Sequence, residues 1–210
     1  MKHAYVFPGQ GAQAVGMGKD LYDNVPEAKA LFEQANEILG FRITDIMFAG
    51  TDEELKQTKV TQPAVFLHSV IMAKALGVKP DAVAGHSLGE FSAWWWPALF
   101  RSKTVCGSFP NVRWPCRKPA KPHPSTMAAR SGIARTKKVE EICASIEGEV
   151  VVCANYNCPG QIVITGEEAA VARAAESLKE AGAKRTVALK VSGPFHSKML
   201  TGAGEKLAKR

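Results

Sequence analysis

The feature that most constrains the fold of this chain is the pentapeptide Gly85-His86-Ser87-Leu88-Gly89, which ends a short apolar run at 82–85. A G-x-S-x-G pattern that follows a strand typically forms a sharp turn leading directly into a helix, with the serine at its apex. The glycines permit this turn and leave the serine hydroxyl accessible. We therefore expect a buried strand at 82–85, a strained turn at Ser87 and a helix directly behind it.

The other periodic segments predict an α/β protein that has a parallel sheet and a small split βαβ unit. Strands are expected at 2–7, 82–85, 150–154, 162–165 and 186–191. Helices are expected at 18–39, 62–76, 139–146 and 167–181, with a further helix start at Thr51. From this order we expect residues 1–126 and 192–210 to form the α/β core and 127–191 to form the smaller subdomain.

The net charge of +7 comes from one part of the chain. Residues 91–139 hold ten Lys and Arg and no Asp or Glu; removing those ten from the 27 basic residues leaves 17 against 20 acids, so the remainder carries −3. Basicity is therefore not a property of the fold as a whole, and we expect no nucleic-acid partner.

Cysteine content and hydropathy indicate which compartment and which partners to expect for this protein. The five cysteines are odd in number and form no CxxC pair, which favours a reduced, cytoplasmic protein without a disulfide framework or metal site. No run reaches the about 20 apolar residues of a membrane helix, so no membrane partner is expected.

The stretch from Trp94 to Pro124 shows no hydrophobic period. It holds all four tryptophans and six of the twelve prolines, so we expect the helix behind Ser87 to fail after Ala93. A linker, genuine divergence and translation out of frame remain open as explanations. Codons can be chosen for residues 111–122 whose overlapping frame reads RALAMQKACEA, an amphipathic helix, which favours a frameshift at about 94–126.

A nucleophilic serine needs a base, and His196 is the strongest candidate because it lies on a loop after a strand. The other histidines fit less well: His3 and His68 suit structural roles, His86 points away from the serine, and His123 lies in the aperiodic stretch. The chain has no Asp after Asp81, and its later glutamates fall in helices or at their starts. A Ser–His dyad oriented by a backbone carbonyl is therefore expected instead of a triad.

Four motifs resemble those of malonyl-CoA:acyl carrier protein transacylases, the acyltransferase domain family. They are VFPGQGAQ at 6–13, GHSLGE at 85–90, NYNCPGQ at 155–161 and GPFHS at 193–197. The likeness covers residues 1–93 and, less evenly, 127–210. It implies an α/β-hydrolase-like core with a ferredoxin-like subdomain, and a cytoplasmic, monomeric enzyme of fatty acid biosynthesis.

The resemblance also implies roles for particular residues. Ser87 would attack the malonyl thioester while His196 takes its proton, and the backbone N–H groups of Gln10 and Leu88 would form the oxyanion hole. Pro8 and Gly9 would turn the exit loop of the first strand so that an amide can approach the serine. Gln161 would line the pocket, although Gln10 and Gln161 also suit ordinary loop positions. Malonyl-CoA would be a substrate, no cofactor would be bound permanently, and acyl carrier protein would be the partner.

Two departures from the family pattern stand out. In the family, an arginine on the second helix after the serine pairs with the malonyl carboxylate. The corresponding part of this chain is the aperiodic stretch. We therefore assign this role to neither Arg113 nor Arg117. Family members also continue beyond a position equivalent to Arg210, so we expect a truncated C-terminus. The alternatives are a serine esterase of α/β-hydrolase type and a catalytically dead product. Malonyl or methylmalonyl selectivity stays open, as does a stand-alone enzyme or a synthase fragment.

Overall fold

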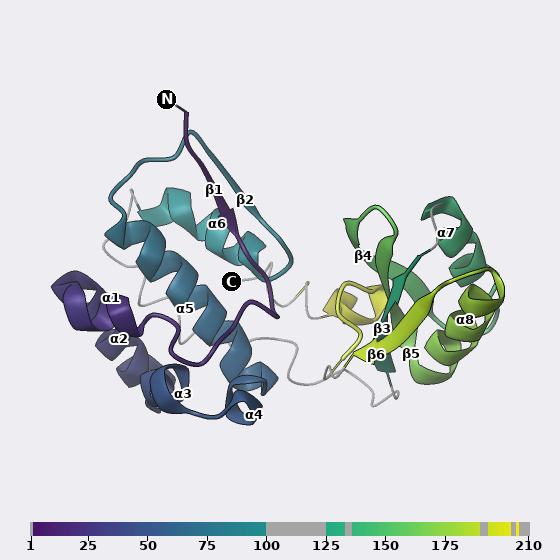
Figure 1. Ribbon diagram of the computed structural model, residues 1–210, viewed down its shortest axis with the longest axis horizontal. Coiled ribbons are helices and arrows are strands. Elements are labelled where there is room, and N and C mark those ends of the chain that lie inside the picture. Colours follow the sequence, from purple (N-terminus) through teal and green to yellow (C-terminus); the bar gives the residue numbers. More distant parts are fainter. Residues whose placement is uncertain (1, 100–124, 133–135, 190–192, 203–204, 206–210) are drawn as a thin grey trace. The chain divides into compact units, whose positions relative to one another are not determined.

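The computed structural model describes residues 2–99, 125–132, 136–189, 193–202 and 205. The chain divides into two compact units, Met1–Arg113 and Trp114–Arg210 (Figure 1). Residues 100–124, which make up most of the expected frameshift at about 94–126 and include Arg113, Arg117 and His123, lie outside the described residues.

The first unit combines a parallel strand pair with helices. Its elements are β1 (Ala4–Phe7), α1 (Lys19–Asn24), α2 (Pro26–Leu39), α3 (Ile43–Ala49), α4 (Asp52–Leu55), α5 (Thr58–Ala75), β2 (Ala82–Gly85) and α6 (Gly89–Leu99). β1 and β2 pair in parallel, from Ala4 opposite Ala82 to Phe7 opposite Gly85. The expected α/β class with a parallel sheet is therefore confirmed, and the helices between the strands form the crossover connection.

The first helical region is broken where the sequence predicted one helix over 18–39. Val25 has extended backbone, with φ −122° and ψ 102°, because the ring of Pro26 disfavours a helical conformation in the residue before it. α2 then ends at Gly40, which adopts φ 73°, as its glycine predicted. The main core of the unit lies between α2, α3 and α5, where Phe32 and Met47 are fully buried. The sequence did not predict α3.

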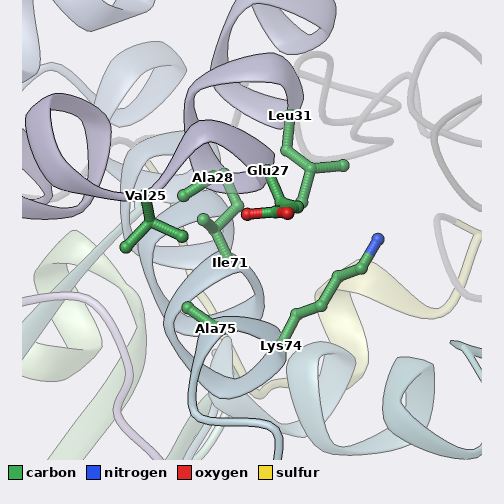
Figure 2. Close-up of a pocket in the computed structure, with 7 residues that line it drawn as sticks. All are labelled: Val25, Glu27, Ala28, Leu31, Ile71, Lys74 and Ala75. Carbon is green, nitrogen blue, oxygen red and sulfur yellow. The ribbon is translucent and has the colours of Figure 1, made fainter.

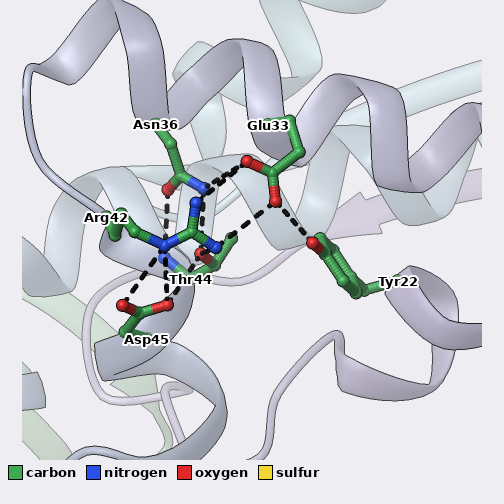
Figure 3. Close-up of polar contacts among 6 residues, drawn as sticks. All are labelled: Tyr22, Glu33, Asn36, Arg42, Thr44 and Asp45. Atoms are coloured by element: carbon green, nitrogen blue, oxygen red, sulfur yellow. Dashed lines mark hydrogen bonds and ion pairs between the residues drawn. The ribbon is translucent and has the colours of Figure 1, made fainter.

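A polar network joins α1, α2 and the start of α3 (Figure 3). The Glu33 carboxylate accepts a hydrogen bond from the Tyr22 hydroxyl and pairs with the Arg42 guanidinium at 3.1 Å. In the buried part of this network, Asn36 Nδ2 donates a hydrogen bond to Thr44 Oγ1 at 2.9 Å. Hydrogen bonds from Tyr22 and Arg42 to the charged carboxylate lower the pKa of Glu33 to about 2.

Helix α6 continues through the tryptophans, and the expectation that it fails after Ala93 was wrong. Ala93 and Trp96 face the core at 7% exposure each, whereas Trp94 on the opposite side is 81% exposed. The Trp96 ring meets the Tyr5 ring at a centroid distance of 5.1 Å. Burial of this ring stabilises the helix, and Pro97 removes only one backbone donor near its end. Because Trp94, Trp95 and Trp96 are all apolar, the hydrophobic pattern did not show which of them faces the core.

Strand β2 is less buried than its sequence predicted. Tyr5 and Val83 pack toward Trp96, but the other face of the strand pair carries Val6 at 74% exposure. Ala4, Ala82 and Ala84 on that same face are also exposed. Among the described residues the sheet of this unit contains two strands, so one of its faces is uncovered.

The second unit is a four-stranded antiparallel sheet with two helices. Its elements are β3 (Ser125–Ser131), α7 (Thr136–Ala144), β4 (Val151–Cys158), β5 (Gln161–Glu167), α8 (Glu168–Glu180), β6 (Arg185–Leu189) and the short 3₁₀ helix η3 (Lys198–Leu200). The strand order is β4-β5-β3-β6. Val139, Ile164 and Leu178, which are fully buried, join α7, the sheet and α8 in one core.

Two features of this sheet differ from the sequence expectation. β3 was not predicted, because its sequence STMAARS has few β-branched residues and follows the aperiodic stretch. β4 extends through Cys158, so residues 155–158, expected in a loop, lie in a strand in which Asn155, Tyr156 and Cys158 pair with β5. None of the helices in the described part of the chain is both long enough and apolar enough to span a membrane.

Candidate active site

Ser87 lies at the apex of the turn between β2 and α6. Its backbone is left-handed, with φ 53°, and it follows His86, whose carbonyl accepts the N–H of Gly89 at 2.9 Å. The Ser87 carbonyl in turn accepts the N–H of Glu90 at 3.0 Å. The strand, strained turn and helix start predicted from GHSLG are confirmed. The turn places a half-buried serine at the N-terminal end of a helix.

The two glycines of the motif are required by space. A Cβ on Gly85 would lie 2.1 Å from the backbone of Gly89, and a Cβ on Gly89 would lie 2.1 Å from the carbonyl oxygen of Phe7. The turn at Gly85–Gly89, which we call the elbow, therefore packs its backbone closely against itself and against the backbone at the end of β1.

The loop after β1 passes directly beside the elbow. Phe7 O accepts the N–H of His86 at 3.0 Å, and a Cβ on Gly9 would lie 3.4 Å from Ser87 Cβ. Gln10 follows in the same loop and its side chain is exposed, whereas Leu88 is buried. The structure thus brings the loop of Gln10 together with Ser87 and Leu88. The N–H groups of Gly89, Glu90 and Phe91 at the start of α6 donate to the carbonyls of the turn, and the turn lies at the positive end of the helix dipole.

Phe7 has a role here that the sequence reasoning missed. Its carbonyl anchors His86, and its position limits residue 89 to glycine. The signal available in the sequence was an apolar strand ending directly before Pro8-Gly9.

Gln161 and His196 belong to the second unit, so their approach to Ser87 remains a prediction. Gln161 is the first residue of β5, where its Oε1 accepts a hydrogen bond from Asn157 Nδ2 at 3.1 Å. His196 is exposed, with left-handed backbone at φ 60°, in a loop between the buried Pro194 and η3. Ser197 Oγ donates to the Pro194 carbonyl at 2.8 Å and thereby holds this loop in a turn.

Two other histidines occupy structural positions. The His3 N–H donates to Asp81 at 2.7 Å, just before β1. His68 is half-buried in α5, and its burial lowers the pKa of the imidazole.

A pocket lies between α2 and α5 (Figure 2). It has a volume of about 190 Å³ and is lined by Val25, Glu27, Ala28, Leu31, Ile71, Lys74 and Ala75. None of the predicted site residues lines it. Within the described ranges, no three or more His, Cys, Asp or Glu side chains are grouped as ligands for a metal ion.

Comparisons with known proteins place these features in a family. Residues 4–210 match the acyl transferase domain family model. The chain is 43% identical to the malonyl CoA-acyl carrier protein transacylase of Bacillus subtilis over 215 residues, covering 98% of this chain and 66% of that protein. It therefore spans just under two thirds of that relative's length.

Solved structures agree with this assignment. An acyl carrier protein S-malonyltransferase from Vibrio cholerae superposes with a TM-score of 0.87 at 38% identity, covering 100% of this chain and 70% of that one. A malonyl-transacylase in complex with a type II PKS acyl-carrier protein superposes with a TM-score of 0.88 at 34% identity, covering 100% of this chain and 69% of that one. The chain therefore belongs to the acyl transferase domain family.

Proposed function

We propose that this chain is an acyltransferase that moves a malonyl group from coenzyme A to the phosphopantetheine thiol of acyl carrier protein, in fatty acid biosynthesis. The observation that carries the proposal is the left-handed Ser87 between β2 and α6, at a helix N-terminus. The names of the relatives, malonyl transacylases, supply the acyl group and the carrier.

In the first half-reaction, Ser87 Oγ attacks the carbonyl carbon of the malonyl thioester and His196 takes the hydroxyl proton. The carbonyl oxygen becomes an oxyanion, which the backbone N–H groups of Gln10 and Leu88 stabilise. The carbon–sulfur bond then breaks, coenzyme A leaves with the proton from His196, and Ser87 carries a malonyl ester.

In the second half-reaction, His196 takes the proton of the carrier thiol, and the sulfur attacks the malonyl ester. The oxyanion forms at the same two amides, and Ser87 leaves with the proton returned by His196. Gln161 lines the acyl pocket. Malonyl-CoA is a substrate in this scheme, and no resident cofactor takes part.

The finer architecture also belongs to this proposal. We interpret the first unit as part of an α/β-hydrolase-like core, with residues 1–126 and 192–210 as its expected extent. The β-α-β-β-α-β order of the second unit and its strand order β4-β5-β3-β6 support a ferredoxin-like subdomain over 127–191. We further propose a monomeric cytoplasmic protein.

The test follows the acyl group. The purified chain is incubated with malonyl-CoA, and the peptide that contains Ser87 is analysed by mass spectrometry; acyl carrier protein bearing phosphopantetheine is then added. We expect a malonyl ester on Ser87 that disappears as the carrier is acylated. Ser87→Ala should abolish the ester, and His196→Ala should slow its formation by roughly 10²- to 10⁴-fold. His3→Ala serves as the matched histidine control.

Two results would contradict the proposal. Absence of both the ester and coenzyme A release would show a chain without acyltransferase activity. Steady hydrolysis of small esters without acylation of the carrier would identify a serine esterase instead.

A further inference from the structure

Gly9 is a glycine for a reason other than backbone conformation. It is not among the glycines with left-handed φ, so an L-residue can adopt its backbone angles. It is buried, however, and a Cβ at this position would lie 2.7 Å from the carbonyl oxygen of His86 and 3.4 Å from His86 Cδ2. Because 2.7 Å is well inside van der Waals contact, a methyl group at Gly9 would force some backbone to move.

The His86 carbonyl has little freedom to yield. It accepts the Gly89 N–H at 2.9 Å at the start of α6, while the His86 N–H donates to Phe7 O at 3.0 Å. Gly89 itself lies against Phe7 and Pro8, because a Cβ there would be 2.7 Å from Pro8 O. The end of β1 is therefore held against the elbow directly before Gly9, and a side chain at Gly9 would displace the loop that carries Gln10.

We propose that Gly9 is a positioning residue for the acyl-transfer site: its lack of a side chain sets the separation between the Gln10 amide and Ser87. This inference rests on the proposed function, in which that amide holds the oxyanion. Gly9 touches neither the substrate nor the reacting atoms and acts through the loop. A displacement on the order of 1 Å lowers the rate of a positioned reaction by about 10²-fold. We therefore expect Gly9→Ala to slow acylation of Ser87 about 10- to 100-fold.

The experiment measures Ser87 reactivity with two reagents on the full chain. A fluorophosphonate reports the nucleophile and the oxyanion hole without any acyl specificity: Ser87 Oγ bonds to phosphorus, fluoride leaves, and the serine proton goes to the base. Malonyl-CoA in a single turnover reports the proposed reaction. Both adducts are followed by mass spectrometry of the Ser87 peptide, which yields a rate constant and a final extent of modification.

The two quantities separate positioning from misfolding. A displaced Gln10 amide lowers the rate constant and leaves the extent complete, whereas an irreversibly misfolded fraction lowers the extent and leaves the rate constant of the folded molecules unchanged. Gly40→Ala is the matched control. Gly40 has φ 73° and open space around its missing Cβ, so alanine there destabilises the same unit through backbone strain alone.

A second variant tests the contact directly and provides a folded protein if Gly9→Ala folds poorly. His86→Gly removes the Cδ2 contact and frees the elbow backbone, so the carbonyl can move away from a methyl at residue 9. Within a double-mutant cycle, Gly9→Ala should slow the reaction less in the His86→Gly background than in the native one.

The outcomes are distinct. A slower rate constant at full extent for Gly9→Ala, a native rate for Gly40→Ala, and partial rescue by His86→Gly support the proposal. A native rate constant for Gly9→Ala, or equal slowing in both backgrounds, would overturn it. So would a native chain unreactive with the fluorophosphonate, because no activated serine would exist to position. If the native chain reacts with the fluorophosphonate but not with malonyl-CoA, the proposed function fails, and the fluorophosphonate rates still decide the role of Gly9.

Discussion

Ser87 and His196 share a backbone property that separates them from their neighbours. In the described part of the chain they are the two non-glycine residues with left-handed φ, at 53° and 60°. Such residues cost of order 1–3 kcal/mol each and cluster at functional sites. The sequence motif had already predicted a strained turn at Ser87, whereas His196 was selected from its loop position alone. The agreement strengthens their candidacy as nucleophile and base.

The strain at Ser87 leads to a stability prediction. Ser87→Gly removes the Cβ that makes φ 53° unfavourable, whereas Ser87→Ala keeps it. We expect the glycine variant to be about 1 kcal/mol more stable than the alanine variant, although both lack the hydroxyl. Urea denaturation of the two variants measures the difference. Equal unfolding free energies would show that the turn stores no strain at this residue.

At the scale of elements, helix α6 shows how tertiary contacts overrode local sequence. Trp96 packs on Tyr5 at 7% exposure, while Trp94, two residues earlier, is 81% exposed. Trp96→Ala should therefore destabilise the protein by about 3–5 kcal/mol, and Trp94→Ala by less than about 0.5 kcal/mol. Thermal and urea unfolding provide the measurement. If both substitutions have the same effect, α6 does not continue through the tryptophans as described.

The Glu33 network gives α1, α2 and α3 a common dependence on pH. The pKa of Glu33 is about 2, below its ordinary value of 4.5, because the carboxylate accepts hydrogen bonds from Tyr22 and Arg42. A lowered pKa means that the folded state binds this proton less readily than the unfolded state. The stabilisation is therefore complete above pH 4.5 and is lost as the pH falls toward 2.

Glu33→Gln tests this dependence. At pH 7 we expect a modest destabilisation of about 1 kcal/mol, because the carboxylate is partly exposed and screened by solvent. The difference from the native chain should shrink between pH 4.5 and pH 2, as the native carboxyl takes up its proton. Glu37→Gln, at an exposed position of the same helix, is the control in urea titrations at each pH. A difference that stays constant down to pH 2 would contradict the assignment.

At the scale of the whole molecule, one sheet face stands out. Parallel strands are normally covered on both faces, yet in the described part of the first unit Val6 is 74% exposed, with Ala4, Ala82 and Ala84 beside it. Water therefore reaches an apolar surface that this kind of sheet usually buries, and such surfaces favour association between molecules.

Val6→Thr should reduce that association. Threonine keeps the branched shape that suits a strand but replaces a methyl with a hydroxyl. We expect weaker binding of the dye ANS and less light scattering at high protein concentration, with an unchanged unfolding transition. Val15→Thr makes the same chemical change at a position 42% exposed outside the sheet and should have no effect. Equal effects of the two substitutions would remove the sheet face as the cause.

Local sequence determined the parts of this protein that depend on short-range chemistry. The GHSLG turn, the Thr51 capping box, the Gly40 helix end and most helices and strands follow from side-chain period, caps and glycine positions. The candidate serine and its loop histidine also follow, because their roles depend on residue type and on the elements that flank them.

Only the tertiary structure decided how far α6 extends, that Ser125–Ser131 pairs between β5 and β6, and that Gly9 and Gly89 hold the elbow against β1. Each of these depends on atoms contributed by distant segments: the Tyr5 ring beneath Trp96, the neighbouring strands that complete a weakly β-forming segment, and the Phe7 carbonyl against the elbow. Contacts between residues far apart in the chain leave no local period, and for that physical reason the sequence alone could not reveal them.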